Sequence, residues 1–393
     1  MKKVAAFLLT AIALQNTSAQ SFIQAYKDRA DMVTQTNINT NLQEFAGFGV
    51  KKTGTAANTN ALNWLKNKYT SYGYTANDLS EDTFTYGSNT SKNLIITKTG
   101  TLYPNQYIII CGHYDTITGP GVSDNGSGTS IILEAARILK NVPTEYSIKF
   151  IHFSGEEQGL VGSSHYVNNV AYQSGTKVLD IKLVLNIDQV GGLLGNNNNT
   201  INCERDTGGM SGNNAASDVA TQELMTCTTL YSPLQTNLSY AYSSDYMPFE
   251  AKGYTITGFY ETIESNNQHT VNDTFANLDP VYVLNVGKAA VGALQHFAVA
   301  STSNNLLSTN DASLQKSGEI IRLYPNPAKD LVTVEFEQKV KQFKVEVNDM
   351  AGNLVLNLEN QEKINTSGLK NGLYTFTIKT DKGNITKKII INK

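Results

Sequence analysis

Three side chains that could bind a metal ion lie close together in the stretch 111–128, CGHYDTITGPGVSDNGSG: His113, Asp115 and Asp124. The stretch joins an apolar run, expected to be a strand, to a segment of helical character that begins near Ser127. Side chains alternate along a strand, so an imidazole and a carboxylate two residues apart point the same way. Two neutral interpretations remain open at this point. His113 could be an ordinary core histidine, and Asp124 could cap the following helix, because Asp is a favoured N-cap residue.

The elements around this stretch alternate between short β-branched runs and segments of helical periodicity. This pattern predicts an α/β fold with a mainly parallel sheet covered on both faces. Polar side chains at the carboxyl ends of the strands are then the candidates for a site, because ligands bind there in such sheets. The expected strands are 93–97, 107–111, 147–153, 181–187 and 255–260; the expected helices are 129–140, 160–170, 215–229 and 281–300, preceded by surface helices within 21–46 and 58–72.

Potential metal ligands follow four of these strands. Each further ligand makes purely structural roles for His113 and Asp124 less plausible. A glutamate pair at a helix start is usually explained by the helix dipole, which favours carboxylates there. Here Gly155 and an apolar strand before it place the pair at the sheet edge. The segment 244–249 could wall a pocket or be an ordinary turn, and His152, His165 and His296 are interpreted as structural or surface residues. The candidates at strand ends are His113, Glu156, Glu157, Asp188 and His269.

Two histidines and three carboxylates can supply five ligands for two divalent ions when one carboxylate bridges. Imidazole and carboxylate ligands without a thiolate favour Zn²⁺, and an open position for water is typical of catalytic sites. Two ions about 3.5 to 4 Å apart can share a hydroxide nucleophile and polarise a carbonyl. A further carboxylate beside them could act as general base. The residue set therefore indicates metal-assisted hydrolysis.

Five motifs occur in order: H-x-D, P-G-x-x-D-N-G-S-G, G-E-E-x-G-L-x-G-S, N-x-D and an H-T loop. Over roughly 46–300 they resemble the co-catalytic zinc aminopeptidases related to bacterial leucyl aminopeptidases. The resemblance implies a three-layer α/β/α sandwich, two Zn²⁺ per chain and peptide or protein substrates that lose their N-terminal residues. It implies one zinc bound by His113, Asp124 and Asp188, and a second bound by Asp124, Glu157 and His269. Glu156 would be the general base, and Asp115 would orient His113.

One departure and two alternatives accompany this resemblance. Relatives often have Tyr before the last histidine, where this chain has Gln268, so the donor to the tetrahedral intermediate is open. A glutaminyl cyclase with a single zinc keeps much of the same ligand set. A surface-binding protein with a relic metal site is an alternative of a different class, weakened because all five ligands and the base are present.

The composition and the first residues of the chain indicate a secreted globular protein. The chain has 393 residues, which predicts two or three domains. Its net charge of -3 gives no electrostatic attraction to nucleic acid or to anionic membranes. Lys2 and Lys3, an apolar run at 4–14 and small residues at 17–19 predict a signal peptide at 1–19. No apolar run approaches the roughly 20 residues that a transmembrane helix needs, so we expect no membrane span.

The three cysteines allow at most one disulfide in an oxidising compartment. The best candidate pair is Cys203 with Cys227. Cys111, at the end of a buried strand, is expected to pack as a small hydrophobic residue.

The C-terminal part differs in composition from the peptidase-like part, 20–300. Residues 301–318 have the composition of a linker, and 319–393 read as short strands without a helix, which predicts a small all-β sandwich. The segments LYPNPAKD, VNDMAGNLV and LKNGLY resemble the C-terminal sorting domain of the Bacteroidetes type IX secretion system. This resemblance implies export through the periplasm to the cell surface or medium, with the secretion machinery as partner. A carbohydrate-binding or adhesive module is the alternative, and we expect the protein to be a monomer.

Overall fold

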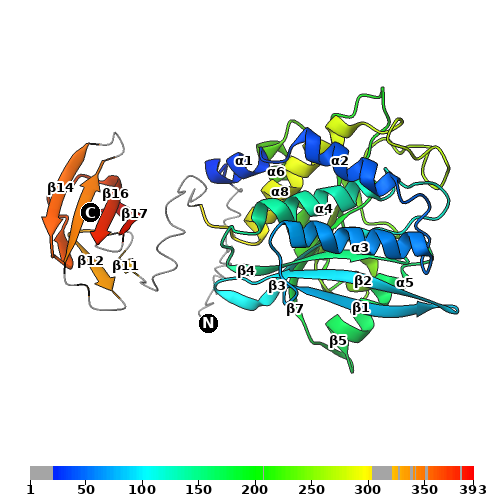
Figure 1. Cartoon of the computed structure of the whole chain (residues 1–393), viewed down its shortest axis with the longest axis horizontal. Helices are drawn as coiled ribbons and strands as arrows, with labels where there is room; N and C mark the ends of the chain where they lie inside the picture. The colour runs from blue at the N-terminus through cyan, green and yellow to red at the C-terminus, as the bar shows by residue number, and fades with distance from the viewer. Residues whose placement is uncertain are drawn as a thin grey trace, which may run out of the picture. The chain divides into compact units, whose positions relative to one another are not determined.

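The structure, a computed structural model, forms two compact units, Met1–Ser303 and Asn304–Lys393 (Figure 1). It describes residues 21–206, 208–302, 321–325, 328–336, 340, 342–349, 353–380 and 383–393. The expected signal peptide and most of the expected linker lie outside these residues. Within the described part of the chain, no helix has both the length and the apolar character needed to cross a bilayer.

An eight-stranded sheet forms the centre of the first unit, in the order β1-β2-β4-β3-β7-β10-β8-β9. Its four central strands, β4, β3, β7 and β10, run parallel, which confirms the mainly parallel sheet. β1 and β2 are antiparallel at one edge, and β8 runs antiparallel to β10. The strands are β1 Leu79–Tyr86, β2 Asn89–Lys98, β3 Tyr103–His113, β4 Tyr146–Phe153, β7 Asp180–Ile187, β8 Thr200–Arg205, β9 Gln235–Tyr240 and β10 Ile256–Glu261.

Helices cover the two faces of this sheet unequally. Ile108 and Ile110 of β3 pack into the larger core beneath the long helices, whereas Ile109 and Cys111 face the smaller core on the other side. The helices of this face, which lie above the sheet in Figure 1, are the short α1 Gln24–Ala30 and the longer α2 Gln35–Ala46, α3 Ala56–Ser71, α4 Gly126–Leu139, α6 Asn214–Tyr231 and α8 Pro280–Phe297. The other face carries α5 Val161–Tyr166, the π-helical turn η1 Val167–Ala171 and α7 Met247–Glu250, beside a small hairpin of β5 Tyr172–Gln173 and β6 Thr176–Lys177.

The segment 21–46 differs from its prediction as one surface helix. It forms two helices, and Tyr26, Leu42 and Phe45 are buried in the larger core. The apolar side chains of this segment join the larger core, where α1 packs against α8 and α6 and α2 packs against α4 and α8. The segment is therefore an integral part of the first unit.

The candidate disulfide between Cys203 and Cys227 is not formed. Both side chains are free thiols, and both are buried in the larger core, Cys203 on β8 and Cys227 on α6. Burial raises the pKa of both thiols. They pack as small hydrophobic residues, as Cys111 does on the other side of the sheet.

The second unit is all-β, as expected. A three-stranded sheet, β11-β12-β15, and a four-stranded sheet, β14-β13-β16-β17, contribute side chains such as Val332 and Val345 to one apolar core. The strands are β11 Ile321–Tyr324, β12 Leu331–Phe336, β13 Phe343–Asn348, β14 Leu354–Glu359, β15 Lys363–Asn365, β16 Gly372–Thr380 and β17 Gly383–Ile391.

Candidate metal centre

The five candidate ligands come together at the carboxyl ends of the parallel strands. They form two groups that share one carboxylate, and within each group the potential ligand atoms all lie within 4.8 Å of one another. His113 closes β3, whereas the other four lie in loops after β3, β4, β7 and β10. The groups are His113, Asp124 and Asp188, and Asp124, Glu157 and His269.

Asp124 faces both histidines, one with each carboxylate oxygen. Its Oδ1 is 3.2 Å from Nε2 of His113, and its Oδ2 is 3.1 Å from Nε2 of His269. His113 Nε2 is also 3.2 Å from Oδ1 of Asp188, and His269 Nε2 is 2.9 Å from Oε2 of Glu157. This is the arrangement that a carboxylate bridging two ions requires.

Capping of α4 is performed by the residue after Asp124. The side chain of Asn125 accepts a hydrogen bond from the N–H of Gly128 at 2.9 Å, so the interpretation of Asp124 as the N-cap is wrong. Asn125 Nδ2 also donates to the main-chain oxygen of Ile187 at 2.8 Å. A Cβ on Gly128 would lie 2.2 Å from that same oxygen, so only glycine allows α4 to start this close to β7. The contact places Asp124 beside Asp188.

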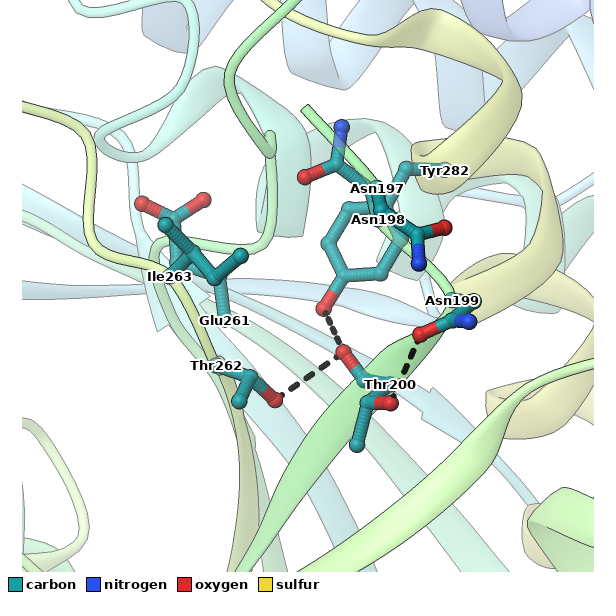
Figure 2. Close-up of a pocket in the computed structure, with 8 residues that line it drawn as sticks. All are labelled: Asn197, Asn198, Asn199, Thr200, Glu261, Thr262, Ile263 and Tyr282. Atoms are coloured by element: carbon teal, nitrogen blue, oxygen red, sulfur yellow. Dashed lines mark hydrogen bonds between the residues drawn. The ribbon is translucent and has the colours of Figure 1, made fainter. Parts of the chain in front are cut away.

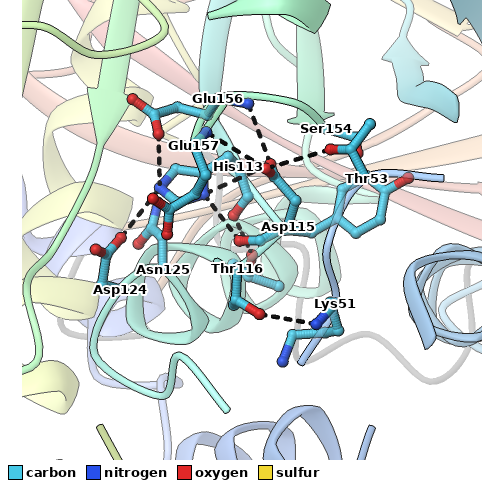
Figure 3. Close-up of polar contacts among 12 residues, drawn as sticks. Lys51, Thr53, His113, Asp115, Thr116, Asp124, Asn125, Ser154, Glu156 and Glu157 are labelled. Carbon is cyan, nitrogen blue, oxygen red and sulfur yellow. Dashed lines mark hydrogen bonds and ion pairs between the residues drawn. The ribbon is translucent and has the colours of Figure 1, made fainter. Parts of the chain in front are cut away.

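Asp115 holds two parts of the centre with different atoms (Figure 3). Its main-chain oxygen accepts from Nδ1 of His113 at 3.1 Å, which leaves Nε2 of that ring facing the other ligands. Its carboxylate lies 3.7 Å from Nδ1, beyond hydrogen-bond range, and instead accepts from the main-chain N–H groups of Glu156 at 3.2 Å and Glu157 at 3.3 Å. A third donor is the hydroxyl of Thr53, at 3.4 Å.

Two hydroxyl groups hold Asp188, and the sequence analysis missed the one from Tyr242. The hydroxyls of Tyr242 and Ser244 both donate to its Oδ2, at 2.8 and 2.6 Å. The segment 244–249, which the sequence analysis considered as a possible pocket wall, therefore contacts the candidate ligand Asp188 directly through Ser244. Its neighbour Asp245 is fully buried, and burial raises the pKa of Asp245 to about 7.

The acidic groups of the centre outnumber its cations. Burial, reinforced by Asp188 and Asp245, raises the pKa of Glu156 to about 10, although His113 opposes the shift. Burial likewise raises the pKa of Glu157 to about 8, and the hydrogen bond to Asp124 raises the pKa of His269 to about 9. The raised pKa values of the two glutamates thus reflect burial of carboxyl groups that are packed close together, an excess of negative charge that a bound cation would offset. An all-imidazole and carboxylate donor set fits Zn²⁺.

The remaining histidines lie in neither ligand group. His152 Nε2 is 2.8 Å from the hydroxyl of Tyr69, and burial lowers the pKa of His152 to about 3. His165 lies 3.1 Å from a carboxylate oxygen of Asp82. His296 Nε2 lies 2.6 Å from the hydroxyl of Tyr231.

Gln268, which stands where relatives often have Tyr, donates from Nε2 to Oε1 of Glu264 at 2.9 Å.

A cavity of about 260 Å³ lies elsewhere in the first unit (Figure 2). It is lined by 197–199, Thr200, 261–263 and Tyr282, and none of the five candidate ligands contributes to it. The hydroxyls of Tyr282 and Thr262 both donate to the main-chain oxygen of Thr200, at 2.9 and 3.0 Å, and so hold its wall. The candidate metal centre is therefore distinct from this cavity.

Two sequence families match the chain. Residues 93–294 match Peptidase family M28, and residues 322–392 match the Secretion system C-terminal sorting domain. Aminopeptidase YwaD of Bacillus subtilis is 41% identical over 108 residues, which are 27% of this chain and 23% of that protein. The match thus spans less than a quarter of that relative's length.

Solved structures share the fold of the first unit. The Legionella pneumophila LapA aminopeptidase has a TM-score of 0.59 at 24% identity, covering 71% of this chain and 77% of its own. The glutaminyl cyclase of Porphyromonas gingivalis has a TM-score of 0.55 at 18% identity, covering 67% of this chain and 98% of its own. At these identities the likeness concerns the fold.

Proposed function

Because the chain belongs to Peptidase family M28, we propose that it is a secreted di-zinc aminopeptidase that releases N-terminal residues from peptides. One observation carries the proposal: two groups of ligand atoms share Asp124, which presents one oxygen to His113 and the other to His269. Its C-terminal sorting domain indicates a secreted or cell-surface protein. We propose the type IX secretion machinery as the partner of that domain.

The residues divide into two binding sets. His113, Asp124 and Asp188 would hold one zinc ion, and Asp124, Glu157 and His269 the other. When bound, the two ions would supply Lewis acidity, which lowers the pKa of water and polarises the scissile carbonyl. Tyr242 and Ser244 keep Asp188 in place through its Oδ2. Asp115 keeps the His113 ring oriented and, through main-chain N–H groups, keeps Glu156 beside Glu157.

Glu156 is the residue available for proton transfer. Its Oε2 lies 3.9 Å from Nε2 of His113, and its side chain is 13% exposed, so it borders the centre and can still reach a substrate. We assign it the removal of a proton from the attacking water and the delivery of that proton to the departing amine. A positioned acid–base group of this kind contributes about 10² to 10⁴ in rate.

The charge of the centre favours a free N-terminus over a free C-terminus as the recognised end. In the described chain, only histidines form ion pairs with the candidate ligand carboxylates; no lysine or arginine does so. The bound ions would neutralise the ligand carboxylates, so the comparison rests on Glu156, which holds no ion and would attract an α-ammonium group and repel a C-terminal carboxylate. Aminopeptidase activity is therefore a better fit than carboxypeptidase activity.

A single-zinc glutaminyl cyclase is the alternative to be separated by experiment. Purified full-length protein would be assayed on aminoacyl p-nitroanilides and on a peptide with N-terminal Gln, with zinc counted per chain. The proposal expects amide hydrolysis with two zinc ions. Cyclisation of the Gln peptide without amide hydrolysis, at one zinc per chain, would identify a glutaminyl cyclase and overturn the proposal. Bound zinc without either activity would support a surface-binding protein with a relic metal site.

A further inference from the structure

Asp273 binds the loop that presents Asp124, from a position 149 residues later in the chain. Its side chain is buried, with an exposure of 2%. Oδ1 accepts from the N–H of Ser123 at 2.7 Å, and Oδ2 accepts from the N–H of Asp124 at 3.0 Å. Its main-chain oxygen accepts from the N–H of Val122 at 3.3 Å. One residue thus receives three consecutive N–H groups and fixes the path of the loop up to Asp124.

The same residue closes the turn at 270–273, which directly follows the turn at 267–270 that carries His269. The N–H of Asp273 donates to the oxygen of Thr270 at 3.2 Å, and the N–H of Thr270 donates to the oxygen of Asn267 at 3.1 Å. His269 has a left-handed backbone, with φ of 56°, and its side chain is 56% exposed, so few contacts of its own hold the ring. Its position depends on this turn.

The two loops also touch at a second point. A Cβ on Gly119 would lie 1.8 Å from the main-chain oxygen of Thr270, so the loop before Asp124 packs directly on the loop of His269. Lys51 also holds the first loop by donating from Nζ to the oxygen of Pro120 at 2.6 Å. The relative placement of the two loops is therefore built into the main chain.

We propose that Asp273 is a positioning residue that fixes Asp124 relative to His269 and thereby sets the affinity for the ion bound by Asp124, Glu157 and His269. The proposal rests on the di-zinc centre proposed above. His113 and Asp188 are held by other groups, namely Asp115, Tyr242 and Ser244. Loss of Asp273 should therefore weaken the ion at His269 more than the ion at His113.

The test compares Asp273→Asn with Asp279→Asn. Asn keeps one acceptor oxygen and presents an NH₂ group to the other N–H. Asp279 is a matched control, because its Oδ1 also accepts two main-chain N–H groups, those of Val281 at 3.0 Å and Tyr282 at 3.2 Å, but at the start of α8. For each full-length variant, zinc per chain, the zinc dependence of peptidase activity and the melting temperature of the metal-free protein would be measured.

Asp273→Asn should retain one zinc after dialysis and need about 10 to 100 times more free zinc for half-maximal activity, the usual effect of losing a residue that supports a ligand. At saturating zinc its kcat should return close to that of wild type. Asp279→Asn should lower the melting temperature and leave the zinc dependence unchanged. If Asp273→Asn does not fold, Gly119→Ala, which displaces the oxygen of Thr270, should give the same selective loss.

Two results would overturn the inference. One is wild-type zinc dependence in a folded Asp273→Asn or Gly119→Ala variant. The other is equal loss of both ions together with a melting temperature lowered as in Asp279→Asn, which is what a purely structural role predicts. A wild-type protein that binds fewer than two zinc ions would instead overturn the proposed centre, and this inference with it.

Discussion

The carboxylate of Asp115 accepts a hydrogen bond from the main-chain N–H of Glu156 at 3.2 Å, across 41 residues of sequence. It accepts from Glu157 in the same way, through its other oxygen. Asp115→Asn leaves one acceptor oxygen, so one of the two contacts is lost and the main chain that carries both glutamates should shift. We expect kcat/KM to fall about 10- to 100-fold, with weaker zinc binding. Steady-state kinetics and zinc titration would measure both effects.

Thr53→Val is the control for Asp115→Asn, since it removes only the longest of the hydrogen bonds to that carboxylate. It should change kcat/KM less than Asp115→Asn does. Equal effects of the two substitutions would mean that the N–H contacts of Glu156 and Glu157 do not matter for the centre.

Glu156 and Glu157 are adjacent, yet Glu156 is assigned as the general base and Glu157 as a zinc ligand. Glu156→Gln should lower kcat by about 10² to 10⁴ and keep two zinc ions, because the side chain moves protons and holds no ion. KM should change less, since the interaction is made mainly in the transition state. Glu157→Gln should lower the zinc content, because its Oε2 lies beside Nε2 of His269. If Glu156→Gln loses zinc and Glu157→Gln does not, the assignment is reversed and wrong.

Much of this centre could be predicted because parallel strands end at one edge of a sheet. His113, Glu157 and Asp188 each follow an apolar run, so their proximity follows from the order of the strands alone. Asp115 shows the limit of such reasoning: its position was predicted, but the orienting contact to His113 comes from its main-chain oxygen. Tyr242 could not be found, because a hydroxyl that reaches a ligand through tertiary packing leaves no periodic pattern.

The missed strands have a similar explanation. β1 and β9 lie at the edges of the sheet, and β1 buries only Phe84, so neither has an apolar run. β8 is short and interrupted by polar residues. The oxidising compartment of a secreted protein and the presence of three cysteines made Cys203 and Cys227 the candidate disulfide pair. In the structure both side chains pack in the core as free thiols.

His152 should make the stability of the first unit depend on pH. Burial lowers the pKa of His152 to about 3 in the folded chain, against about 6.5 for an unperturbed histidine in the unfolded chain. Below pH 6.5 the unfolded state binds a proton that the folded state does not. The free energy of unfolding should therefore fall by roughly 1.4 kcal/mol for each pH unit from 6.5 toward 3.

Urea unfolding of metal-free protein at pH 7 and pH 5 would measure this dependence. His152→Gln should have a shallower dependence than wild type. Identical slopes for wild type and His152→Gln would show that His152 does not contribute.

The C-terminal unit should be dispensable for catalysis and required for export. A truncation after Ala300 would remove contacts of the first unit, because Ser301 donates from N–H to the oxygen of Pro143 and accepts from Arg29. Truncation after Thr302 should therefore leave kcat/KM unchanged while stopping secretion, as judged by peptidase activity in medium and cell fractions. A folded but inactive truncation, or one still exported, would contradict this division of roles.

Two zinc ions bound around Asp124 are proposed to perform the aminopeptidase chemistry, a claim that the zinc content of active protein decides. Elemental analysis of purified protein, paired with hydrolysis of leucine p-nitroanilide, should give two zinc ions per chain. Removal of both ions by a chelator should abolish hydrolysis, added zinc should restore it, and the N-acetylated substrate should not be cleaved. Full hydrolysis by metal-free protein, or by protein that binds a single ion at saturating zinc, would contradict the claim.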